Sequence, residues 1–158
     1  MASPLVDLSA LNLTADVVDD AEIRRYIPHT DEFRLIDGIC HLDLEAELVV
    51  AYKVWDPDPW WARGHIPGRP LMPGVLMIEG AAQTATFLLK SLEEWARDAF
   101  VGLAGCDRVR FRQTVTPPAK IYFASRPGSR GRRLVRYPTQ CFHQGKLVMD
   151  MELIGAAF

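Results

Sequence analysis

One histidine and one carboxylate stand out in the middle of the chain, on either side of a proline-rich loop. His65 precedes the loop, and Glu79 follows it in a nearly all-apolar segment. A carboxylate in apolar surroundings is costly unless it is paired, protonated or used in chemistry. An imidazole can serve as a base and a carboxyl as an acid, and free N–H groups at Gly74 and Val75 can stabilise negative charge. Together these groups form the parts of a proton-transfer site.

Each of the two residues also has a structural interpretation. Glu79 alone is equally consistent with a hydrogen bond to nearby backbone or with a wet rim, and a lone histidine next to a glycine, such as His65, is usually structural. Their co-occurrence around the start of a helix favours the chemical interpretation.

The loop and the apolar segment predict how these residues are positioned. Pro67, Pro70 and Pro73 are spaced three apart. Each fixes its own φ and favours extended geometry before it, so residues 66–72 are predicted to form a stiff, polyproline II-like strap. Proline is tolerated where a helix begins, and apolar residues on nearly every side predict a central helix over 74–97 that the fold wraps.

The rest of the chain predicts an arm over residues 1–18, a short helix over 21–26 and several strands. The strands are expected over 33–42, 47–55, 101–115, 121–125, 134–142 and 146–154. No repeat or linker divides the chain, so we expect one domain over 1–158. One buried helix and five or six antiparallel-capable strands predict an α+β fold, a curled sheet wrapped around the helix.

The spacing bears on whether one chain can hold both groups. An extended strap from His65 to Pro73 spans roughly 25 Å. The helix back to Glu79 returns only about 7.5 Å. The strap therefore tends to separate the two groups within a chain, although glycines in it allow bends. A site shared between two chains is suggested, and a site within one chain stays open.

Three blocks of the sequence resemble a known family. The segment GHIPGRPLMPGVLMIEGAAQ, residues 64–83, closely resembles the signature of the (3R)-hydroxyacyl-acyl carrier protein dehydratases of the FabZ type, and blocks over 27–39 and 109–121 are similar to that family too. Relatives that also isomerise the product carry Asp where this chain has Glu79. Ile66 replaces the family's usual Phe, and Pro118-Ala119 its usual Gly-Asp.

The resemblance implies a hotdog fold and the elimination of water from (3R)-3-hydroxyacyl thioesters. It implies His65 as the base from one protomer and Glu79 as the acid from the other, with the Gly74 N–H holding the thioester carbonyl beside Val75. Gln83 lies one turn beyond Glu79 and is expected to orient its carboxyl or to serve as a structural hydrogen-bonder. No metal and no organic cofactor is required, because the thioester activates the α-proton. His29 matches the family's Pro-His pair and is expected to buttress the fold.

The acyl chain and its carrier need surfaces of their own. Small residues beside Phe87 are candidates for an acyl slot or ordinary core: Ala81, Ala82 and Ala85. An acyl carrier protein is usually acidic, so a basic rim is expected to receive it, and the alternative is a solvated basic face. The candidates are Arg108, Arg110 and Arg112 on one predicted strand face, and Arg130, Arg132 and Arg133 at a turn.

Composition limits the remaining classes. The 158 residues carry a net charge of −2, which argues against nucleic acid as a partner. The apolar run over 75–89 is too short to span a membrane, and Cys40, Cys106 and Cys141 have no metal-site spacing, so a cytoplasmic protein is expected.

An open sheet edge predicts a homodimer, and the resemblance implies a dimer or a hexamer of three dimers.

Two other functions stay open at this stage. A hotdog thioesterase would use a carboxylate on the same helix to direct water at the thioester. A non-catalytic module would bind acyl thioesters without turnover. The sequence leaves open the acyl chain length, the choice between carrier protein and coenzyme A, and the choice between fatty-acid and polyketide-type synthesis.

Overall fold

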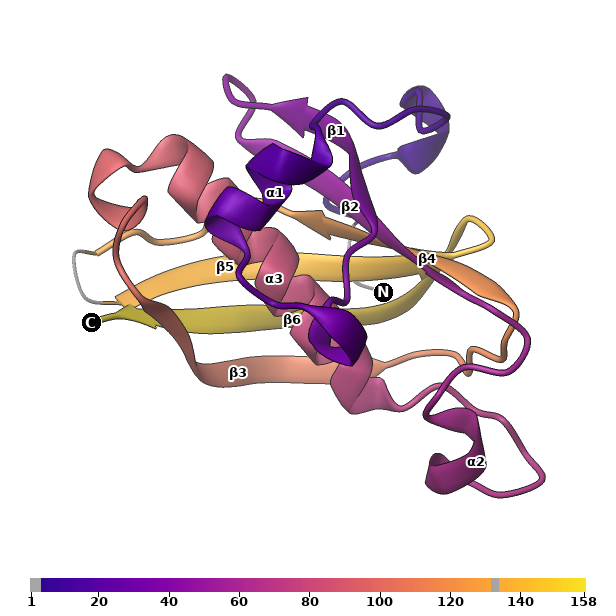
Figure 1. The fold of residues 1–158 in the computed structure, drawn as a ribbon. Helices are drawn as coiled ribbons and strands as arrows, with labels where there is room; N and C mark the ends of the chain where they lie inside the picture. Colours follow the sequence, from indigo (N-terminus) through magenta and orange to yellow (C-terminus); the bar gives the residue numbers. More distant parts are fainter. Residues whose placement is uncertain (1–3, 132–133) are drawn as a thin grey trace.

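The computed structural model describes residues 4–131 and 134–158. Within them, one antiparallel sheet has the strand order β1-β2-β4-β5-β6-β3, and helix α3 (Gly74–Leu92) lies across one face of it (Figure 1). A curled sheet around one long helix is the arrangement that the sequence predicts.

The strands follow the predicted pattern, with differences at their ends. They are β1 (Gly38–Asp43), β2 (Leu48–Trp55), β3 (Val101–Phe111), β4 (Ala119–Ser125), β5 (Leu134–His143) and β6 (Lys146–Ala157). Side chains on the helix-facing side of β2 and β4, such as Val49, Ala51 and Phe123, are at most 1% exposed. They form the core together with α3.

The shorter helical segments lie around this core. They are η1 (Leu8–Ala10), α1 (Asp20–Tyr26), η2 (Asp31–Phe33), α2 (Ala62–His65) and η3 (Glu94–Ala96). Asp19 caps α1 by accepting the Glu22 N–H at 2.8 Å.

The first strand begins later than predicted. Residues Asp31–Phe33 form η2, and β1 starts only at Gly38. Leu35 and Ile36 are 1% and 0% exposed, and the Leu35 N–H donates to the Gln83 side chain instead of to another strand. The apolar residues before Gly38 therefore belong to a buried loop.

Two other predicted boundaries are wrong. β3 ends at Phe111 because the chain then turns toward the loop before α3, where the Val115 carbonyl accepts the Met72 N–H at 2.8 Å. α3 ends at Leu92 and not at 97, since Glu93 adopts extended geometry with φ −110° and ψ 112°. The following η3 turn buries Ala96 completely.

The N-terminal residues cover the face of the sheet opposite α3. Val6, Leu8, Leu11 and Leu13 pack against a cluster that includes Val50. Val50 alternates with the core residues Val49 and Ala51, so it points to the other face.

Among the described residues, the edge strand β3 pairs only with β6, and no strand pairs with its other edge. Among the described residues, no helix combines the length and the apolar character that crossing a bilayer requires.

Candidate active site

Helix α3 carries a single carboxylate, Glu79, whose side chain is 26% exposed. Two hydroxyls on the same helix are satisfied locally: Thr84 and Ser91 each donate to the carbonyl four residues earlier, at 2.8 Å. Glu79 differs from these hydroxyls, because it is bonded by a side chain and lines a cavity instead of bonding the backbone of its own helix.

Gln83 fixes one oxygen of this carboxylate. Its side chain is almost fully buried, and its amide nitrogen donates to Glu79 Oε1 at 2.9 Å and to the Phe33 carbonyl at 2.7 Å. Its Oε1 accepts the Leu35 N–H at 3.0 Å. These bonds use both N–H groups of the amide, so Gln83 connects the carboxylate to the loop before β1. Gln83 thus makes structural hydrogen bonds and also contacts the carboxylate that it was expected to orient.

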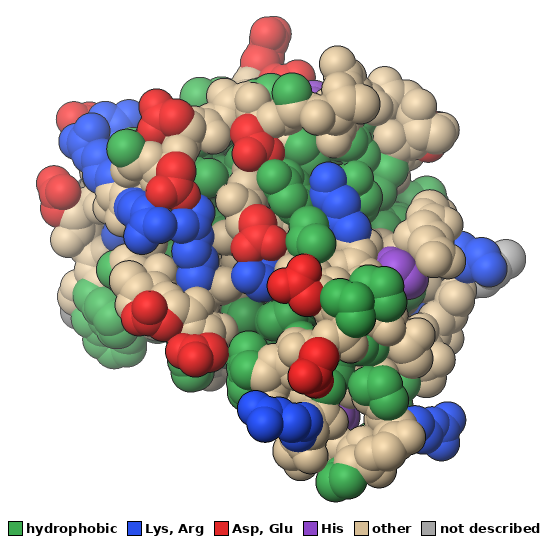
Figure 2. Space-filling model, turned by 45° about the vertical axis from the view of Figure 1, so that its right-hand side comes forward, with side chains coloured by type: hydrophobic (Ala, Val, Ile, Leu, Met, Phe, Trp, Pro, Cys, Tyr) green, Lys and Arg blue, Asp and Glu red, His purple; other side chains and the backbone are tan. Residues whose placement is uncertain are grey.

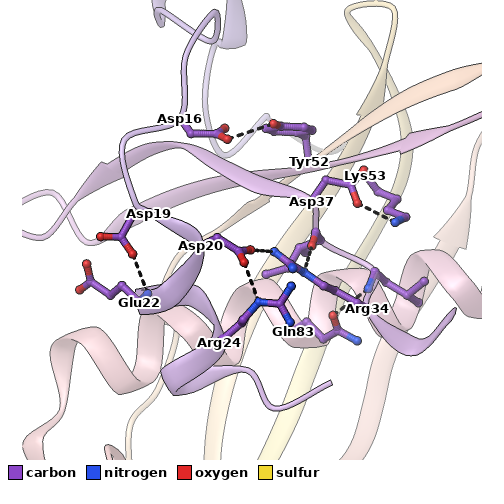
Figure 3. Close-up of polar contacts among 12 residues, drawn as sticks. Asp16, Asp19, Asp20, Glu22, Arg24, Arg34, Asp37, Tyr52, Lys53 and Gln83 are labelled. Carbon is purple, nitrogen blue, oxygen red and sulfur yellow. Dashed lines mark hydrogen bonds and ion pairs between the residues drawn. The ribbon is translucent and has the colours of Figure 1, made fainter. Parts of the chain in front are cut away.

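Ion pairs anchor that loop at both ends (Figure 3). Arg34 pairs with Asp20 on α1, and its Nε donates to the Ile36 carbonyl at 3.2 Å. Asp37 pairs with Lys53 on β2 at 2.6 Å. The Leu35 N–H that binds Gln83 therefore lies between two tethered residues, and the Phe33 carbonyl directly precedes the first of them.

His29 also approaches this carboxylate oxygen. Its Nε2 is 3.4 Å from Glu79 Oε1, and its Nδ1 is buried without a hydrogen-bond partner among the described residues. We expected His29 to support the fold, and its position beside Glu79 was not predicted. The Pro-His pair at 28–29 was the only signal, and it gave no indication that the loop returns to α3.

A cavity of about 280 Å³ opens beside Glu79 and runs along α3. Glu79, Gln83, Thr86 and Lys90 follow one another along its helical wall, and Val101–Leu103 at the start of β3 lie across it. Lys90 donates to the carbonyls of Arg97 and Ala99 at the far end, and burial lowers its pKa. The cavity is thus acidic at one end and basic at the other.

A smaller cavity of about 40 Å³ branches from the same wall toward Leu89 and Tyr137. Of the residues considered for an acyl slot, Ala82 lines both spaces and Ala85 lines the smaller one. Ala81 and Phe87 are completely buried in the core and line neither cavity.

His65 does not line the Glu79 cavity. It is the last residue of α2, it is exposed, and its Nδ1 is 2.8 Å from the Leu71 carbonyl. Because a carbonyl only accepts, the proton of the neutral imidazole lies on Nδ1, which leaves the lone pair on Nε2. His65 is therefore held in the tautomer that a base needs.

The predicted extended strap is wrong. The Arg69 N–H donates to the Ile66 carbonyl at 3.0 Å across Pro67 and Gly68, and Gly68 has φ 77°. Proline followed by a residue with positive φ is typical of a type II turn, which reverses the chain. The turn brings Leu71 back to His65, so the segment is a compact loop.

The start of α3 has no side-chain cap. Pro73 precedes the first turn, where the N–H groups of Gly74 and Val75 lie, and the Phe111 ring packs against Gly74. A Cβ at Gly74 would lie 2.6 Å from that ring, so only a glycine allows the ring to pack this close to the helix.

The arginines expected to form a basic rim are partly neutralised. Arg108 pairs with Glu152 at 2.8 Å, and Arg112 pairs with Asp150. A bulge between Asp107 and Arg110 interrupts the predicted alternation, with Arg108 at φ 55°.

Within the described residues, Arg110 is exposed and has no ion pair, whereas Arg130 pairs with Glu47 and Glu93. Arg132 and Arg133 lie outside the described residues. On the face shown in Figure 2, acidic and basic side chains lie next to one another.

Comparisons with known proteins agree with this architecture. A model of the FabA-like domain matches residues 27–152. The bifunctional enzyme LpxC/FabZ of Chlorobaculum tepidum is 30% identical over 139 residues, which cover 88% of this chain and 30% of that enzyme. The chain thus spans under a third of the length of this curated relative. These matches confirm the resemblance to FabZ-type dehydratases.

Solved structures show the same fold at low sequence identity. The dehydratase heterocomplex ApeI:P of Xenorhabdus doucetiae has a TM-score of 0.70 at 15% identity, covering 86% of this chain and 90% of that chain. A mutant of the thioesterase PA1618 of Pseudomonas aeruginosa has a TM-score of 0.67 at 14% identity, covering 92% and 98%. These likenesses confirm the hotdog fold.

Proposed function

The chain belongs to the FabA-like domain family, and on that premise we propose that it removes water from (3R)-3-hydroxyacyl thioesters to give trans-2-enoyl thioesters. The observation that carries the proposal is the setting of Glu79. Gln83 holds its Oε1, no side chain of the described residues bonds its Oε2, and a cavity runs from it along an apolar helix. A carboxyl with one fixed and one free oxygen is suited to proton donation.

The elimination needs a base at the α-carbon. Nε2 of His65 takes the α-proton, and the C–H electron pair forms the double bond between C2 and C3. Glu79 donates its proton to the 3-hydroxyl as the C3–O bond breaks, so water leaves. The proton on His65 then returns to Glu79 through solvent, which restores both groups.

Charge on the thioester oxygen must be stabilised while the α-proton leaves. The N–H groups of Gly74 and Val75 lie at the positive end of α3 and lack a side-chain cap. They are our candidates for binding this oxygen.

We assign His65 and Glu79 of one site to different protomers. Two observations support this assignment: His65 lies outside the Glu79 cavity of its own chain, and β3 leaves an open edge beside that cavity. Pairing of two β3 edges in a homodimer would join the sheets, and three such dimers would form a hexamer.

Acyl carrier protein is the proposed carrier of the substrate, and Arg110 is the best candidate contact. Arg108 and Arg112 already bind acids, so replacing them would also break ion pairs. We expect Arg110→Glu to raise KM for a carrier-bound substrate by roughly threefold to tenfold, in a salt-dependent manner. The same variant should turn over a small thioester without a carrier at the wild-type rate, and a carrier-bound KM equal to wild type would exclude Arg110 from docking.

The reaction is tested by product analysis. The protein is incubated with (3R)-3-hydroxyacyl thioesters of several chain lengths, while enoyl absorbance and free thiol are followed together. We expect enoyl product without free thiol, and a loss of roughly 10²–10⁴-fold in Glu79→Gln, which has the same shape but no acidic proton. Free thiol would identify a thioesterase, and tight binding without turnover would identify an acyl-thioester-binding module.

A further inference from the structure

His29 approaches the carboxylate oxygen that Gln83 also binds. Two nitrogens face Glu79 Oε1, Gln83 Nε2 at 2.9 Å and His29 Nε2 at 3.4 Å. The second distance is longer than a typical N–H···O hydrogen bond, so His29 is a close neighbour of this oxygen and Gln83 its hydrogen-bond donor. Within the described residues, no side-chain hydrogen bond is formed to the other carboxylate oxygen, Oε2.

The environment of the His29 ring indicates where its proton lies. Nδ1 is buried and has no partner among the described residues. A proton on Nδ1 would bury an N–H without an acceptor, which costs more than burying a lone pair. The ring is therefore best placed as the neutral tautomer with its proton on Nε2, directed at Glu79.

The other polar groups of the cavity do not compete for this oxygen. Tyr26 and Lys90 are its remaining titratable wall residues, and the Lys90 ammonium is engaged by the Arg97 and Ala99 carbonyls. Glu79 Oε1 is thus approached by two nitrogens, one on α3 and one on the loop after α1.

We propose that His29 is a positioning residue for Glu79, which together with Gln83 occupies Oε1 and leaves the acidic proton on Oε2, facing the substrate. A carboxyl oxygen that accepts two N–H bonds is poorly placed to carry a proton, so the donors select which oxygen acts. The inference rests on the proposed dehydration, and it assigns a role in cis, because His29 and Glu79 belong to one chain.

Two variants separate positioning from packing and from acid–base chemistry. His29→Phe keeps an aromatic ring but has no N–H, while His29→Gln keeps an N–H at a similar reach but cannot titrate near neutral pH. We expect His29→Phe to lower kcat by about tenfold to a hundredfold with KM within about twofold, and His29→Gln to stay within about threefold of wild type.

Three results would overturn the proposal. They are a wild-type kcat in His29→Phe, an effect on KM alone, and a His29→Gln variant as slow as His29→Phe. Thermal unfolding of both variants accompanies the kinetics. If His29→Phe does not fold, His29→Leu takes its place with the same expected kcat.

Mixed dimers test the assignment in cis. Mixing His29→Phe with His65→Ala places an intact His29 and Glu79 opposite an intact His65 in each heterodimer, so activity should rise to about a quarter of wild type. Mixing His29→Phe with Glu79→Gln leaves every site damaged and should give no rise. Recovery in the second mixture would contradict the inference. Enoyl formation by the wild-type protein is measured first, so failure of the reaction itself is distinguished from failure of this role.

Discussion

Gln83 donates to Glu79 Oε1 at 2.9 Å while its own Oε1 accepts the Leu35 N–H at 3.0 Å. One buried amide therefore links the candidate acid on α3 to the loop before β1. Because that loop also carries the Phe33 carbonyl that Gln83 binds, the stability of the fold and the orientation of the acid depend on the same side chain.

Gln83→Leu should weaken both the stability of the fold and the orientation of Glu79. The substitution leaves the buried Leu35 N–H and the part-buried Phe33 carbonyl without their partner, and an unsatisfied buried group costs about 1–3 kcal/mol. We expect the free energy of unfolding to fall by roughly 2–5 kcal/mol, measured by urea titration at fixed protein concentration. Gln113→Leu is the control, since Gln113 is exposed and should change by no more than about 0.5 kcal/mol. Equal effects in the two variants would contradict the role of Gln83.

Gly80 is required by the close approach of Phe123 to α3. A Cβ at Gly80 would lie 2.6 Å from the Phe123 ring, which is 1% exposed and cannot move aside easily. We expect Gly80→Ala to destabilise the protein by roughly 1–2 kcal/mol, although alanine favours helix by about 1 kcal/mol.

Gly64→Ala is the matched control for Gly80→Ala. Gly64 also lies in a helix, α2, but a Cβ added there would have no neighbouring atom within 4 Å. The substitution should be neutral or stabilising by up to about 1 kcal/mol in thermal or urea unfolding. A neutral Gly80→Ala would show that the helix and sheet can separate at this contact.

Alkaline pH should destabilise the fold through its buried thiols. Burial raises the pKa of Cys40 to about 11 from 9.0, and its Sγ–H donates to the Val50 carbonyl. Above pH 9 the unfolded chain loses this proton while the folded chain keeps it, so the stabilisation present below pH 9 is lost progressively up to about pH 11.

The measurement is the unfolding free energy between pH 8 and pH 10 in the wild type and in Cys40→Ala. We expect the slope above pH 9 to be shallower in the variant, by up to about 1.4 kcal/mol per pH unit. Burial also raises the pKa of Cys141, so some slope should remain. Identical slopes would mean that Cys40 is not kept protonated by the fold.

The sequence predicted the central helix and most strands because their signals are local. Apolar residues on every side of α3 and the apolar, β-branched run of β2 are signals that lie within each segment. The same reasoning singled out Glu79, since a carboxylate in such a helix needs an explanation. Gln83 was predicted to lie beside it from helical periodicity alone.

The errors arise where distant segments meet. His29 reaches Glu79 because the loop after α1 returns to α3. The hydrophobic periodicity of a sequence does not predict the course of such a loop. The strap was predicted from its prolines, yet Gly68 at positive φ turns the chain back. Leu35 resembles a strand residue because it is apolar, but its N–H is satisfied by a side chain on α3.

The most direct test of the proposed site combines two inactive variants. His65→Ala and Glu79→Gln should each lose roughly 10²–10⁴-fold in dehydration when assayed alone. After subunit exchange is confirmed by mass, a site shared between protomers predicts that an equal mixture recovers about a quarter of wild-type activity, because each heterodimer holds one intact pair. No recovery in such heterodimers would contradict the shared site.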